Sequence, residues 1–131
     1  MTVTGNTEGF RDLESDVATA KGEFVLFALF MREDVPDRWD LMVSAPWIGD
    51  DKQGAVDYLV GEIRSRIGTQ ALTDLSRIVV VDPNDAAVQA LNRAIRIEHG
   101  GVEVKDSNFF GLQVKHAFII TSKQPSAPSE A

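Results

Sequence analysis

The chain has 131 residues and a mass of 14.3 kDa, and with 44% hydrophobic and 25% charged residues it has the size and composition of one globular domain. Cysteine is absent, which excludes disulfides, thiolate metal sites and cysteine nucleophiles. The formal net charge of -7 disfavours a nucleic-acid partner, because such binding depends mainly on Lys and Arg neutralising phosphates.

The first predicted elements along the chain are a helix and a pair of strands. Apolar residues recur at helical spacing from Glu8 to Ala20, which predicts an amphipathic helix. The segment from Glu23 to Met31 is apolar at nearly every position and predicts a strand that is covered on both faces. A polar turn leads to an alternating pattern from Trp39 to Ala45, so we expect these two strands to form an antiparallel hairpin.

The middle of the chain predicts two helices separated by a strand. An apolar stripe from Lys52 to Ile67 indicates a helix. The segment from Arg77 to Asp82 predicts a buried strand, because its consecutive apolar residues leave no polar face. Asp82 has the character of an N-cap with Pro83 at the first helical position, so the second helix is expected from there to Ile97.

The last predicted elements are a short strand from Val102 to Val104 and a strand from Leu112 to Thr121. The sequence therefore predicts an α/β (or α+β) class. We expect a mixed sheet of four to five strands, with an N-terminal β-hairpin that follows a helix and precedes two helix-strand units. We also expect a flexible N-terminus over residues 1–7, a single domain over residues 8–122 and a disordered tail over residues 123–131, which is rich in Pro, Ser and Ala.

The chain contains no segment that predicts membrane insertion or secretion. The longest apolar run, Phe24 to Met31, has eight residues, whereas a membrane helix needs about twenty. The first fifteen residues carry charges and lack an apolar centre, which argues against a secretory signal. We therefore expect a cytoplasmic protein that does not contact a membrane.

The negative charge is concentrated in the first 51 residues, which hold 11 acidic and 4 basic side chains. One acidic group surrounds the first turn, from Glu33 to Asp40, and a second consists of Asp50 and Asp51. The strand between the groups spans more than roughly 20 Å, so we expect them near opposite ends of the sheet. Neither group has the ligand spacing of a calcium loop, and we interpret both as solvated loops without a metal ion.

An alternative with catalysis rests on Asp82, Glu103 and Lys105. Two carboxylates that hold a divalent metal ion, with a lysine near the scissile phosphate, are the groups that a metal-dependent phosphodiester or nucleotide hydrolase needs. A predicted helix separates Asp82 from Glu103 in the sequence, and Asp82 is also explained as a helix cap. This alternative requires all three side chains in one cleft.

Neither histidine belongs to a catalytic motif. His116 is expected to share one face of the last strand with Val114, Phe118 and Ile120, which predicts a core histidine. His99 follows the last turn of a predicted helix, where the helix dipole favours a positive imidazole without any function.

Glycine-rich phosphate loops are also absent from the sequence. Ligands nevertheless bind in open α/β sheets at the carboxyl ends of parallel strands without such a motif. At that position Asp82 and Asn84 would lie beside a ligand crevice.

The aromatic residues Trp47, Phe109 and Phe110 stand in predicted loops, where they cover the core or contact a partner. Because interfaces are enriched in Trp and Phe, we take these three residues as the candidate binding surface. We interpret the chain as a binding or protein-interaction domain without catalysis of its own and without a cofactor. Its expected partner is another protein or a second copy of the chain, bound through an exposed strand edge or the aromatic loop.

Overall fold

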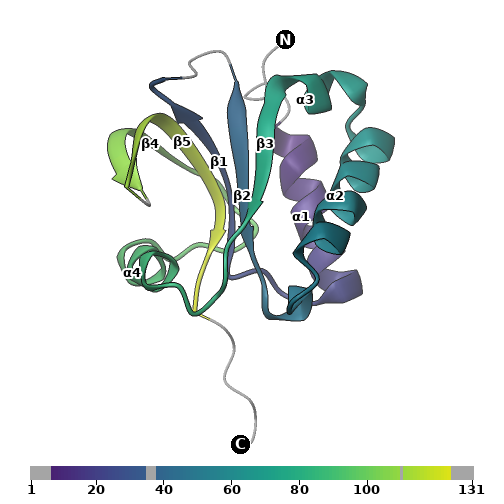
Figure 1. The fold of residues 1–131 in the computed structure, drawn as a ribbon, viewed down its shortest axis with the longest axis horizontal. Coiled ribbons are helices and arrows are strands. Elements are labelled where there is room, and N and C mark those ends of the chain that lie inside the picture. Colours follow the sequence, from purple (N-terminus) through teal and green to yellow (C-terminus); the bar gives the residue numbers. More distant parts are fainter. Residues whose placement is uncertain (1–6, 35–37, 110, 125–131) are drawn as a thin grey trace, which may run out of the picture.

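The computed structural model describes residues 7–34, 38–109 and 111–124. In chain order its elements are α1 (Thr7–Lys21), β1 (Leu26–Arg32), β2 (Trp39–Ser44), the 3-10 helix η2 (Pro46–Ile48), α2 (Lys52–Arg66), α3 (Thr69–Asp74), β3 (Leu75–Val80), α4 (Ala86–Ala94), β4 (Val102–Phe109) and β5 (Leu112–Ser122). The strands form one five-stranded sheet in the order β3-β2-β1-β5-β4 (Figure 1). The predicted fold class is therefore confirmed, as is the N-terminal hairpin.

The sheet is mixed, and β1 lies at its centre, antiparallel to both β2 and β5. β2 and β3 are parallel and are joined through α2 and α3, whereas β4 and β5 form an antiparallel hairpin. β2, β3 and β5 consequently run in one direction. Their carboxyl ends meet at one rim of the sheet, at the bottom of Figure 1.

Both faces of the sheet carry helices. Figure 1 shows α1, α2 and α3 on one side and α4 on the other. The core beneath α1, α2 and α3 contains Phe10, Leu13, Val17, Phe27, Leu29, Trp39, Leu41, Leu59 and Ile63. The core on the α4 side contains Leu26, Ala28, Phe30, Met42, Val88, Leu91, Ala117 and Ile119. Since full burial of one large apolar side chain contributes about 1.5–3 kcal/mol, these two layers supply most of the driving force for folding.

The start of α4 differs from the sequence prediction. Asp85, not Asp82, is the N-cap, and its carboxylate accepts a hydrogen bond from the Ala87 N–H at 2.8 Å. Asp82 instead closes a turn by accepting the Asn84 N–H at 2.8 Å. The prediction of a cap at Asp82 was wrong because an aspartate two residues before a free N–H suits a turn as well as a helix start. α4 is therefore shorter than expected and ends at Ala94.

Two further elements depart from expectation. The short helix α3 was not predicted, because its six residues carry too little periodicity to identify. β4 continues to Phe109, beyond the end predicted at Val104, and includes the polar segment Asp106 to Asn108. Asp106 has a φ of 51° inside this strand, a conformation that aspartate tolerates better than most residues do. Among the described residues, no helix is both long and apolar enough to cross a membrane.

The predicted termini lie mostly outside the described residues, as do Phe110 and Asp37. Of the tail expected from residue 123, Lys123 and Gln124 are described, and Lys123 is held by contacts with Glu23 and Glu98. The flexible N-terminus and the rest of the tail remain predictions.

A buried charge cluster connects three neighbouring strands at the sheet. Asp40 on β2 is only 2% exposed, and its Oδ2 lies 2.8 Å from Arg32 Nε on β1 and 3.2 Å from Arg77 Nε on β3. An ionised carboxylate in this position requires cationic partners, because its desolvation is costly. Asp40 was expected in a solvated acidic group, and its burial corrects that expectation.

We predict that Asp40→Asn lowers the free energy of unfolding by about 3 kcal/mol, because removing one partner of a buried ion pair leaves the other uncompensated. Urea unfolding followed by circular dichroism measures the loss. Asp34→Asn is the matched control, since the Asp34 side chain contacts the same Arg32 at 3.2 Å but is 72% exposed. Its expected cost is below about 0.5 kcal/mol, and equal losses in the two variants would contradict the assignment.

Candidate functional site

The structure separates the residues of the hydrolase alternative. Asp82 follows β3, whereas Glu103 and Lys105 lie on β4, at the opposite edge of the sheet. Four strand intervals of about 4.8 Å place these edges roughly 19 Å apart along the sheet. Ligands of one metal ion lie only about 2–2.5 Å from it. Asp82 and Glu103 therefore do not share a metal ion, and no group of three or more potential ligands occurs within the described part of the chain.

His116 shares a face of β5 with Phe118 and Ile120, as predicted, but not with Val114. Its ring is 5.4 Å from the Trp39 ring, and its Nε2 contacts Glu103 Oε2 on the adjacent strand. The pairing of β5 with β1 shifts register between His116 and Val114. Val114 consequently packs in the core on the α4 side, whereas Phe118 contacts the other core. His116 is a half-buried strand residue whose imidazole is engaged by a carboxylate.

A buried polar network that the sequence analysis missed joins α1 to β5. Glu14 is fully buried. Its Oε2 accepts the hydroxyl of Thr121 at 2.8 Å, and its Oε1 lies 2.5 Å from Nδ1 of His99. The His99 N–H in turn donates to the Thr121 hydroxyl oxygen at 3.1 Å. These bonds hold His99 at a φ of 54°, in the left-handed region.

The signal for Glu14 was present in the spacing of α1. Phe10, Leu13, Glu14 and Val17 are its buried residues and occupy positions i, i+3, i+4 and i+7, the pattern of a core-facing stripe. A glutamate inside such a stripe requires a buried partner. The partners, His99 and Thr121, are 85 and 107 residues away in the sequence, and no local pattern identifies them.

The outer side of His99 faces further charges. Its Nε2 lies 3.6 Å from Glu98 Oε2, and the same oxygen is 2.5 Å from Lys123 Nζ, which also contacts Glu23. Burial lowers the pKa of Lys123, but its hydrogen bonds with Glu98 and Glu23 outweigh that effect and raise the pKa above its ordinary value. A histidine oriented by a buried carboxylate is the arrangement of many general bases. In this protein carboxylates face both ring nitrogens of His99, and the nearby hydroxyl of Thr121 donates to Glu14. We therefore interpret the arrangement as a structural link between α1 and β5.

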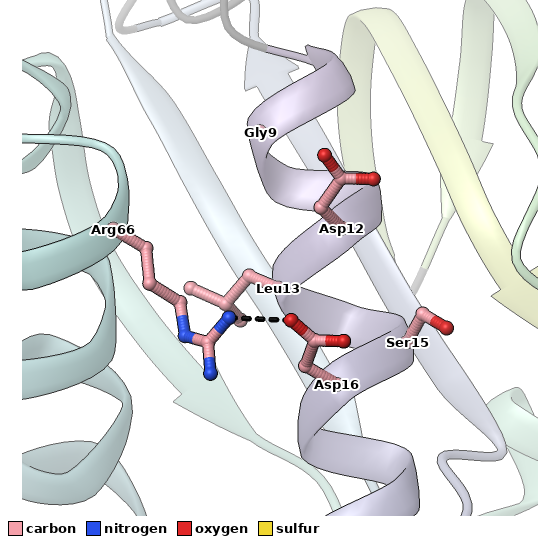
Figure 2. A pocket seen from close by; sticks show the side chains of 6 residues that line it. All are labelled: Gly9, Asp12, Leu13, Ser15, Asp16 and Arg66. Carbon is pink, nitrogen blue, oxygen red and sulfur yellow. Dashed lines mark hydrogen bonds and ion pairs between the residues drawn. The ribbon is translucent and has the colours of Figure 1, made fainter.

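Figure 2 shows a polar hollow between α1 and α2, lined by Gly9, Asp12, Leu13, Ser15, Asp16 and Arg66. The guanidinium of Arg66 spans the seam, with Nη1 2.5 Å from Asp16 Oδ2 and Nε 2.6 Å from Glu62 Oε1. The hydrogen bonds with Glu62 and Asp16 raise the pKa of Arg66 above its ordinary value. Because its one cation is already paired twice, we interpret this hollow as an ion-paired helix seam.

The predicted aromatic surface is largely directed at the protein itself. Trp47 is half-buried, with its ring 5.8 Å from that of Phe24 and 6.4 Å from that of Tyr58. Phe109 is also half-buried and stacks on Phe30 at 5.0 Å. Phe110 lies outside the described residues. These contacts favour a role in covering the core for Trp47 and Phe109.

The two edges of the sheet differ in chemistry. The edge strand β4 carries the exposed charged residues Glu103, Lys105 and Asp106, and the backbone of Asp106 is in the left-handed region. Charges and backbone irregularities of this kind protect strand edges against pairing with other chains. β4 is therefore a protected edge.

The other edge, β3, lacks this protection. Its residues Ile78, Val79 and Val80 are apolar and half-buried. Its one charged residue, Arg77, is bound to Asp40. In the described part of the chain, no strand pairs with the outer side of β3. This open apolar edge is the candidate functional site.

Comparison with models of known families gives no match for this chain, and comparisons with curated proteins and with solved structures give none either.

We predict that Glu14 and His99 are energetically coupled by about 2 kcal/mol in a double-mutant cycle of Glu14→Gln and His99→Asn, because the Glu14 carboxylate is fully buried although the His99 side chain is 41% exposed. Asparagine tolerates the left-handed backbone of His99 and is too short to reach Glu14. Urea unfolding of the wild type, both single variants and the double variant gives the coupling energy.

The exposed pair of Glu103 and His116 provides the matched control for this cycle. The Glu103 side chain is 48% exposed, so Glu103→Gln and His116→Asn should couple by less than about 1 kcal/mol. A smaller coupling for the Glu14 pair than for the Glu103 pair would show that the buried network does not hold α1.

Proposed function

We propose that the chain is a protein-interaction module that associates with a second copy of itself through the open edge of β3. The observation that carries this proposal is the difference between the two sheet edges: β4 bears charges and a left-handed residue, whereas β3 presents Ile78, Val79 and Val80. An exposed apolar strand edge is a template for pairing with another strand. No catalytic step and no cofactor form part of the proposal.

The direction of the backbone groups on β3 supports strand pairing. The N–H of Val81 donates to the carbonyl of Val43 on β2 at 2.9 Å. Backbone groups alternate in direction along a strand, so those of Val79 point to β2 and those of Ile78 and Val80 point to the open side. Two residues thus offer both a donor and an acceptor to an incoming strand.

A second copy fits this edge in one antiparallel register. With the two-fold axis at Val79, Ile78 of each copy lies opposite Val80 of the other, and the two residues exchange both backbone hydrogen bonds. The side chains of Ile78 and Val80 are then on the face covered by α2, and those of Val79 and Val81 are on the face covered by α4. Apolar side chains therefore meet apolar side chains on both faces.

Electrostatics at the edge does not prevent pairing with a second copy. Arg77 is held by Asp40 within its own chain and presents no unpaired charge to the incoming strand. On α2, Lys52, Gln53 and Val56 line a shallow hollow with the strand, and this hollow extends the apolar surface of Val80. The net charge of -7 on each copy opposes association at long range, but salt at physiological strength screens charges beyond about 8 Å.

The expected association is weak. A single strand pair gives an interface at the small end of the known range, below about 1,200 Å², which is typical of transient complexes. Another protein that offers an extended apolar segment would compete for the same edge. The cytoplasmic location expected from the sequence remains a prediction.

We predict a dimer with a dissociation constant on the order of 10 µM. Val79→Lys should abolish it, because two lysines would face each other on the two-fold axis. Sedimentation velocity measures the dimer fraction over a roughly hundredfold range of protein concentration, from about 5 to about 500 µM, which begins near that constant. Val104→Lys, a half-buried valine on the opposite edge strand, is the matched control and should dimerise as the wild type does.

Hydrogen exchange of the wild type provides a measurement that does not depend on folding of the variants. The amides of Ile78 and Val80 should exchange more slowly at high than at low protein concentration, because pairing protects them. A monomer at every concentration would overturn the proposal. A dimer that Val104→Lys dissociates and Val79→Lys does not would also overturn it.

A further inference from the structure

A third hollow lies at the rim where the carboxyl ends of β2, β3 and β5 meet. It has a volume of about 300 Å³ and is lined by Pro83, Asn84, Gln89, Asn92, Arg93 and Gln124. These residues come from the turn after β3, from α4 and from the segment after β5. The carboxyl ends of strands are where open α/β sheets bind ligands, and Asn84 had been expected beside such a crevice.

The most informative residue of this hollow is Asn92. It is 1% exposed, although asparagine is disfavoured both in a helix interior and in an apolar core. Its Oδ1 accepts the hydroxyl of Ser122 at 3.0 Å. Among the described residues, no hydrogen bond engages its Nδ2, and Asn92 is one of the residues that line the hollow. The bond with Ser122 holds the amide through its oxygen and leaves its N–H groups available to a ligand.

The other polar groups around Asn92 are similarly uncommitted. Among the described residues, the side chains of Gln89, Arg93 and Gln124 have neither an ion pair nor a hydrogen bond. By contrast Arg32, Arg66 and Arg77, named above, are all paired with carboxylates. Arg93 thus keeps its five donors for another anion.

We infer that this hollow is a binding site for a small polar monoanion that carries one carboxylate and one carbonyl group. Arg93 would bind the carboxylate, and the N–H groups of Asn92 would donate to the carbonyl, as charge-assisted and neutral hydrogen bonds. The flexible amides of Gln89 and Gln124 supply both donors and acceptors at the rim.

Neighbouring charges and size limit the class of ligand. Asp82 and Asp85 flank the turn that contributes Asn84, and their negative charge disfavours a di- or triphosphate. A volume of about 300 Å³ is at the lower end of the range for ligand pockets. Both limits select a small carboxylate metabolite over a nucleotide. The inference does not depend on pairing at β3.

Succinamate, which carries one carboxylate and one carboxamide, is a suitable probe for the full chain. We predict that its titration, followed by ¹H–¹⁵N NMR, gives saturable shifts of the side-chain NH₂ signal of Asn92 with a dissociation constant of about 1 mM. Arg93→Gln should weaken binding about tenfold, because it removes a charge-assisted hydrogen bond. Arg96→Gln removes an exposed charge three residues further along and should leave binding unchanged.

Uncharged succinamide tests the carboxylate requirement and should bind about tenfold more weakly than succinamate. Linear, unsaturated shifts up to about 20 mM succinamate would overturn the inference, since that is well above the expected constant. Equal weakening by Arg93→Gln and Arg96→Gln would overturn it as well, because the effect would then be one of net charge. The Asn92 signal of the unliganded Arg93→Gln variant reports whether the hollow itself is intact.

Discussion

The rest of the structure depends on one strand that is apolar on both faces. From Leu26 to Phe30 every side chain of β1 is fully buried. Phe27 and Leu29 face one core, and Leu26, Ala28 and Phe30 face the other. A strand of this kind must lie between two others and be covered above and below, because every exposed face would leave apolar surface in water. The central position of β1, the two helical layers and the order of the five strands satisfy this constraint together.

The same constraint explains why the polar groups inside the protein are paired as they are. Asp40 and Glu14 lie within layers that β1 and its neighbours exclude from water, so each needs partners that replace hydration. Asp40 has two arginines from adjacent strands, and Glu14 has the hydroxyl of Thr121 and the imidazole of His99. The Glu14 carboxylate connects elements that are distant in sequence, and Asp40 connects the hairpin of β1 and β2 to β3. The paired charges therefore specify which elements are neighbours, in addition to any stability that they contribute.

Local periodicity in the sequence is enough to predict the longer helices and the burial of a strand. Helical spacing predicted α1 and α2 to within a residue at each end, and the apolar run predicted that β1 is covered on both faces. The N-cap of α4 was predicted at Asp82 and lies at Asp85. Both aspartates accept a hydrogen bond from a nearby N–H, and only the backbone conformation distinguishes the turn at Asp82 from the helix start at Asp85. The sequence predicted binding through an exposed strand edge but did not identify β3 as that edge, because strand order depends on long-range pairing. Likewise, nothing in the sequence of α4 distinguishes Asn92. The ligand contact that we propose for it depends on Ser122 and the rim of the sheet, which the fold places beside it.

Strand order also accounts for the asymmetry on which the proposed function rests. β4 ends the sheet on the side of a hairpin, where a charged strand with a left-handed residue retains its partner β5 without attracting another. β3 is attached through a parallel crossover, and its apolar side chains are needed on both faces to contact the two cores. Charged residues cannot replace Ile78, Val79 or Val80 without cost to those cores. The requirement that keeps β3 apolar thus leaves its outer edge able to pair, and a second copy of β3 would satisfy that edge with the same side chains that the cores already select.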